Sequence, residues 1–171
     1  NNSALPGDAF AARSGTSSAA AVATGAAALF LERWRALHGA DARPAPALMR
    51  AVFAHTATDL GRPGPDYLHG YGLLNLLAAV ELLDADAGTQ ARLPSASTSA
   101  TTPERFYNLT VSGGAPLKAT LCWTDEPGDV LAAAALVNDL DLRVIRRADG
   151  GVFRPWTLSR TAPEQPAGTG V

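Results

Sequence analysis

The sequence predicts a chain in two parts, a mainly helical part up to about Leu83 and an antiparallel β part from residue 104 onward. Ala-rich patterning with helical spacing gives way, between Asp84 and Pro103, to a tract rich in Ser, Thr, Pro and Ala. Such a tract is typical of a linker. Short segments rich in Val, Leu, Thr and aromatic residues follow it, and they predict strands. The predicted division is therefore 1–83, a linker over 84–103, and 104–171.

Three helices are predicted in the first part, over Ser17–Arg35, Pro46–Thr56 and Leu73–Leu83. The first is unusual because residues 19–31 carry no charge, and only one Thr and one Gly interrupt the apolar run. A helix that is apolar all round has to be buried on every side. The other two helices are too short to wrap it. We therefore expect its remaining partners outside this chain, with the first part as the C-terminal part of a larger domain.

Four strands are predicted in the second part, over residues 105–112, 117–123, 140–146 and 152–158. Four strands do not close the two sheets of a β-sandwich. The second part is accordingly expected to be a partial antiparallel β-sandwich, cut off in the loose tail 162–171.

Composition excludes several classes of function. The chain has 171 residues, of which 47% are hydrophobic and 18% charged, as in globular domains. Its net charge is −2 and no basic stripe is present, so nucleic acid is not an expected partner. No apolar run reaches the roughly 18–20 residues that cross a bilayer. The lone Cys122 excludes an internal disulfide and a thiolate metal cluster, and an inert buried thiol is expected there.

A candidate nucleophile lies just ahead of the apolar helix, in the run Ser14-Gly15-Thr16-Ser17-Ser18. The first backbone N–H groups of a helix lack intrahelical partners, and the positive end of the helix stabilises a developing oxyanion. Ser17 is therefore placed like an attacking hydroxyl. The alternative is an ordinary serine N-cap, which local chemistry alone favours.

The wider run of residues resembles subtilisin-like serine proteases (subtilases, peptidase family S8). The resemblance begins with Ser3-Ala4-Leu5-Pro6-Gly7, continues through Ser14–Ser17 and the small residues of the helix, and includes His55-Thr56-Ala57 and Gly70-Tyr71-Gly72-Leu73-Leu74-Asn75. It implies an α/β domain, of which this chain holds mainly helices. It also implies a serine endopeptidase that acts on protein or peptide substrates, with Ser17 as the acyl-forming nucleophile.

The same resemblance places the Asp and His of the triad, and the rest of the catalytic domain, upstream of Asn1. These residues alone are therefore expected to be inactive. His38, His55 and His69 are interpreted as structural or exposed, because none has the His-Gly-Thr context of the family's base. Lys118, the only lysine, falls in a predicted strand of the other part, so a Ser–Lys pair is disfavoured.

One departure from the family pattern keeps a second function open. Ala21 stands where the family usually has a proline four residues after the nucleophile. The alternative is a catalytically inactive homologue that acts as a binding or structural protein through its β-sandwich. The resemblance also implies an extracellular or cell-envelope location.

The second part resembles the C-terminal β-sandwich of larger subtilases, in Leu117–Gly128 and in Leu136–Leu142. Its acidic side chains offer oxygen ligands for calcium but lack the spacing of an EF-hand loop: Asp125, Glu126, Asp129, Asp139 and Asp141. The alternative is a solvated face or turn-holding carboxylates. Catalysis needs no cofactor, structural calcium stays open, and no residue is assigned as a metal ligand.

Overall fold

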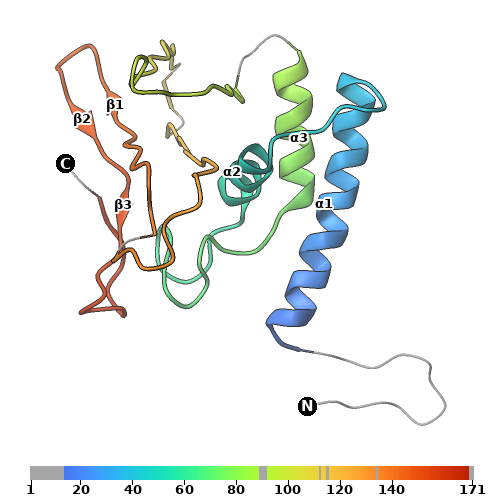
Figure 1. Cartoon of the computed structure of the whole chain (residues 1–171), viewed down its shortest axis with the longest axis horizontal. Helices are drawn as coiled ribbons and strands as arrows, with labels where there is room; N and C mark the ends of the chain where they lie inside the picture. The colour runs from blue at the N-terminus through green and yellow to red at the C-terminus, as the bar shows by residue number, and fades with distance from the viewer. Residues whose placement is uncertain (1–13, 89–91, 112, 115, 134, 170–171) are drawn as a thin grey trace.

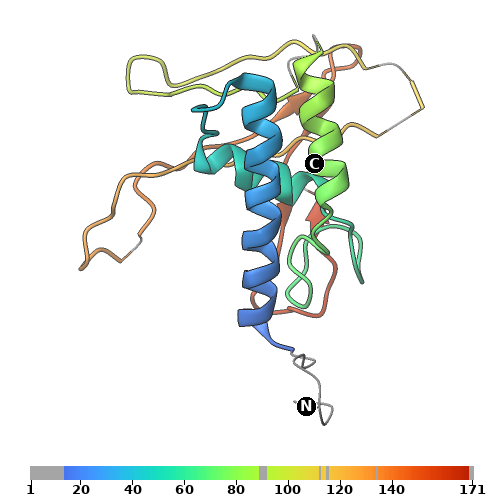
Figure 2. The same ribbon diagram turned by 90° about the vertical axis from the view of Figure 1, so that its right-hand side faces the viewer.

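Three helices and two small sheets make up the computed structural model, which describes residues 14–88, 92–111, 113, 114, 116–133 and 135–169. The helices are α1 (Thr16–His38), α2 (Pro46–Thr56) and α3 (Leu76–Ala87). The α1 and α3 helices run alongside each other, and α2 crosses beside them (Figures 1 and 2).

Each helix boundary has a local cause. Gly15 is the N-cap of α1, with a φ of 134° that favours glycine. Pro46 opens α2, where its missing N–H costs nothing. The α3 helix starts at Leu76 rather than at the predicted Leu73, because Leu73 pairs with Thr58 in a β-bridge. The α3 helix continues to Ala87, into the segment predicted as a linker.

The core lies where the three helices meet. Phe30 of α1, Val52 of α2, and Ala79 and Leu83 of α3 are almost fully buried. The ring of Phe30 meets that of Phe53 edge to face, with centroids 5.4 Å apart. An exposed ion pair between Arg33 and Asp84 also joins α1 to α3.

Part of the apolar surface of α1 has no cover among the described residues. Ala26 and Phe30 are its buried residues, whereas Val22 is 68% and Leu29 54% exposed. The helix is apolar all round, but the described residues bury only part of its surface.

Two separate two-stranded antiparallel sheets form in the second part. β1 (Val144–Ile145) pairs with β2 (Val152–Phe153), and β3 (Trp156–Thr157) pairs with β4 (Gly168–Thr169). A turn stabilised by the Arg146–Asp149 ion pair connects β1 to β2. Asp149 has a pKa of about 2, because Arg146 donates hydrogen bonds to its carboxylate.

The strand predictions are therefore correct only in part. Described residues of the predicted strands 105–112 and 117–123 form no strand, and β4 was not predicted. The apolar side chains of the first segment stay exposed, with Phe106 at 81% and Leu109 at 63%, so no buried face fixes a pairing register. A β-sandwich is not seen in the part of the chain that the structure describes.

Candidate active site

The first turn of α1 positions the candidate nucleophile. The first backbone bond of the helix runs from the Ala19 N–H to the Gly15 carbonyl, at 3.1 Å. The N–H groups of Thr16, Ser17 and Ser18 precede it and point out of the helix start. No side chain caps this end, so the interpretation of Ser17 as a serine N-cap does not hold in the structure: Gly15 has that place.

Ser17 is the second residue of the helix and is exposed. Within the described residues, its hydroxyl has no hydrogen-bond partner, and no histidine or carboxylate contacts it. The helix start can supply backbone N–H donors and the positive end of the helix dipole to a negatively charged oxygen. Activation of the hydroxyl needs a base from elsewhere.

The three histidines are engaged away from Ser17. His38 ends α1, about 30 Å along the helix from Ser17, and stacks on Trp34 with ring centroids 4.0 Å apart. The Nδ1 atom of His55 lies 3.0 Å from the hydroxyl of Thr120. His69 lies in the loop after α2, with its Nδ1 3.6 Å from Asp66.

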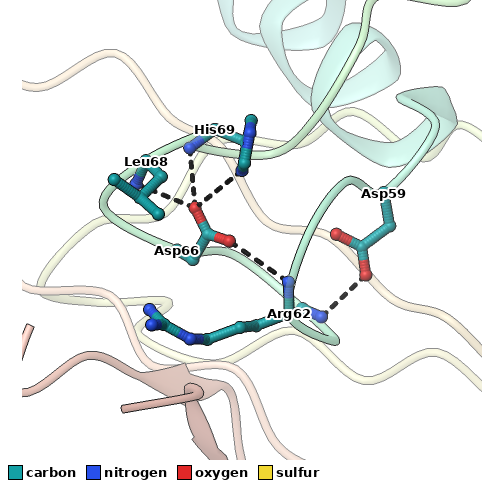
Figure 3. Close-up of polar contacts among 6 residues, drawn as sticks. Asp59, Arg62, Asp66, Leu68 and His69 are labelled. Carbon is teal, nitrogen blue, oxygen red and sulfur yellow. Dashed lines mark hydrogen bonds and ion pairs between the residues drawn. The ribbon is translucent and has the colours of Figure 1, made fainter. Parts of the chain in front are cut away.

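The loop between α2 and α3 is organised around Asp66, a residue that the sequence analysis did not single out (Figure 3). Among the described residues Asp66 is the one charged residue that is buried. Its Oδ1 accepts from the N–H groups of Leu68 and His69, at 2.8 and 2.6 Å. Its Oδ2 accepts from the Arg62 N–H at 3.4 Å.

These N–H donors determine the charge state of the Asp66 carboxyl group. The His69 backbone N–H, assisted by those of Leu68 and Arg62, holds the pKa of Asp66 below its ordinary value, although burial acts in the opposite direction. The carboxylate is thus ionised at neutral pH and satisfies backbone donors that the tight loop leaves unpaired. The signal in the sequence is the Gly- and Pro-rich run 61–65 directly before an Asp, which is typical of a turn held by a carboxylate.

Two of the acidic side chains considered for calcium, those of Asp125 and Asp129, hold turns. The Asp125 carboxylate accepts from the backbone N–H of Val137 at 2.7 Å and from the side-chain amide of Asn138 at 2.8 Å. The Asn138 amide first, and then the Val137 N–H, lower the pKa of Asp125. The Asp129 carboxylate accepts from the Leu131 N–H. Across the described residues, no three of the side chains His, Cys, Asp and Glu come together as a metal site would require.

The remaining candidate side chains have other environments, away from Ser17. Cys122 is a free, half-buried thiol. Trp34 packs against the helical core. The Lys118 ammonium donates to the backbone carbonyl of His55.

Comparison with known proteins shows that the first part of the chain is similar in sequence to a known family. Residues 1–72 match the sequence model described as Subtilase family. The protein "Serine protease/ABC transporter B family protein tagA" of Dictyostelium discoideum is 29% identical over 161 residues, which are 86% of this chain and 9% of that relative. No solved structure matches.

The resemblance to the subtilases is therefore confirmed. The chain spans 9% of the length of the relative, and the matched region holds α1, α2 and Ser17. None of the described helices is sufficiently long and apolar to cross a membrane.

Proposed function

Since residues 1–72 carry subtilase sequence, we propose that the whole protein is a serine endopeptidase in which Ser17 is the acyl-forming nucleophile. The observation that carries the proposal is the position of Ser17 inside the matched region. Its exposed hydroxyl stands in the first turn of a 23-residue helix, beside backbone N–H groups that precede the first helical bond.

The proposed reaction is acyl transfer through a serine ester. The Ser17 Oγ attacks the carbonyl carbon of the peptide bond, and a histidine from upstream of Asn1 takes the hydroxyl proton, oriented by an upstream Asp. The Ser17 N–H donates to the oxyanion, and a donor of this kind contributes roughly 10²–10³-fold in rate. The histidine then protonates the leaving amine, and water hydrolyses the acyl-enzyme. The 171 residues alone lack the base and are inactive.

The rest of the catalytic domain is proposed to pack against the exposed apolar side chains of α1 and α3. Val22 and Leu29 on α1, and Leu77 on α3, are each more than half exposed. Burial of such side chains is worth roughly 1.5–3 kcal/mol each. This apolar surface supports a partner that covers α1, as its uncharged sequence requires. By the same resemblance, we place the protein outside the cell or in its envelope, with protein or peptide substrates.

Fluorophosphonate labelling of the full-length protein tests the proposal directly. The reagent phosphonylates activated serine hydroxyls with loss of fluoride, so the label is expected on the peptide that contains Ser17 and is expected to vanish in Ser17→Ala. The matched control is Ser18→Ala, which removes the neighbouring hydroxyl and leaves labelling intact. Peptide hydrolysis should fall by roughly 10³–10⁶-fold in Ser17→Ala alone.

The competing proposal is an inactive homologue that binds partners through its β part, and Ala21 is the residue that favours it. A folded, matured protein that takes no label would support this second function. It would also overturn the protease proposal.

A further inference from the structure

Residues 118–123 of the second part lie along α2, and three polar contacts define what we call the α2 contact. The Lys118 Nζ donates to the backbone carbonyl of His55, and the Thr120 hydroxyl lies 3.0 Å from the His55 Nδ1. Farther along, the Arg50 Nη2 donates to the Trp123 carbonyl at 3.0 Å. The segment thus runs from the last turn of α2 back toward its first.

Of the residues in this contact, His55 is the one whose protonation should affect it most. Its side chain is half-buried, and burial first and the Lys118 ammonium second lower the pKa of the imidazole. Both effects oppose the protonated form. Since Lys118 itself is exposed, solvent screens its share, and burial is the main cause.

No acidic group in the described residues counteracts this lowering of the His55 pKa. The α3 helix packs on α2 and carries three carboxylates. Asp84 pairs with Arg33, Asp86 accepts from the backbone N–H groups that follow α3, and Glu81 is exposed. On α2 itself, Arg50 is the other charged group, and it is held by the Trp123 carbonyl.

We propose that His55 makes the α2 contact sensitive to pH: the contact forms while the imidazole is neutral and loosens when the imidazole takes up a proton. The second part of the chain would then release the subtilase-matched part on acidification. The neutral ring bonds to the Thr120 hydroxyl as either donor or acceptor, so the hydrogen bond itself sets no preference for the charged form.

The direction and the size of the pH effect on the α2 contact follow from proton linkage. In the folded chain, burial first and Lys118 second hold the pKa of His55 below its ordinary value, so we expect the contact to be fully stable above about pH 6.5, the ordinary imidazole value. It weakens as pH falls from there toward the lowered value and is constant below it. One proton changes the contact equilibrium by at most about tenfold per pH unit.

The lone Cys122 reports on the contact, because it lies between Thr120 and Trp123 and is half-buried. The experiment measures the rate of its reaction with dithiodipyridine in the full chain between pH 7.5 and 4.5. Dividing each rate by that of the urea-unfolded chain at the same pH cancels the chemistry of the thiol. The normalised rate should rise several-fold as pH falls below about 6.5.

His55→Gln keeps a side chain that hydrogen bonds to Thr120 but does not titrate, so its normalised rate should stay within about twofold across the range. The matched control is His38→Gln, which removes a histidine at the end of α1 and should keep the wild-type response. A flat wild-type profile, or a response that persists in His55→Gln, overturns the proposal.

A second measurement covers the case in which His55→Gln fails to fold by circular dichroism. NMR titration of the wild-type imidazoles should place His55 at a lower pKa in the folded chain than in urea. An equal or higher pKa in the folded chain overturns the proposal regardless of the variant.

Discussion

Phe30→Ala tests the helical core, because its ring is fully buried where α1, α2 and α3 meet. Truncating a buried Phe to Ala costs roughly 3–5 kcal/mol, through lost burial and the cavity that remains. The edge-to-face contact with Phe53 is lost as well and places the cost toward the upper half of that range. Such a loss is a large share of the roughly 5–15 kcal/mol that holds a typical domain together.

The neighbouring residue supplies the control. Leu29 is on the same turn of α1 but is 54% exposed, so Leu29→Ala should change the free energy of unfolding by no more than about 1 kcal/mol. Urea unfolding of the full chain, followed by far-UV circular dichroism, measures both variants. If Phe30→Ala and Leu29→Ala lose equal stability, the helical core is not arranged as described. In the full-length protein, the proposed cover over α1 should raise the cost of Leu29→Ala to roughly 2–5 kcal/mol.

Two further predictions concern the loop between α2 and α3. Gly72→Ala would place a Cβ 2.1 Å from the Thr58 carbonyl oxygen, whereas Gly70→Ala meets nothing within 4 Å, and both positions have positive φ. Gly70→Ala should therefore cost about 1 kcal/mol, and Gly72→Ala clearly more, in urea unfolding; equal costs would refute the close approach. Asp66 has a lowered pKa, so its stabilising effect is present above about pH 4 and is lost as pH falls through the lowered value. The wild-type unfolding midpoint should fall over that range, and Asp66→Asn should reduce the change; an unchanged profile in Asp66→Asn would contradict the role of the carboxylate.

Much of the helical part could be predicted because its signals are local. Pro46 marks the first residue of α2, and the predicted end at Thr56 is also observed. The Gly before Thr16 marks the start of α1 to within one residue. The helix was predicted to start at Leu73 because this residue directly follows the Gly70-Tyr71-Gly72 turn, but its backbone pairs with Thr58, a residue from another segment. A local turn signal does not report that competing partner.

The candidate site was accessible to sequence reasoning for a related reason. The placement of Ser17 at the start of α1 depends on the residues beside it, so its position could be predicted to within one residue. The role of Asp66 depends on a loop that folds back to bring three N–H donors to one carboxylate. Its Gly and Pro residues predict a turn, but the burial of the side chain depends on where the loop closes.

The second part shows why a strand pattern can be present without a strand. Residues 105–111 include Phe106, Leu109 and Val111, the composition of a strand, yet all three side chains are more than half exposed. A helix satisfies its backbone groups within one segment, whereas a strand needs a second one. β1 and β2 meet that need because a short turn, held by Asp149 and Arg146, brings the partner close. Segments without such a turn need a distant partner with a matching apolar face, and the same lack of a matching face leaves Val22 and Leu29 bare on α1.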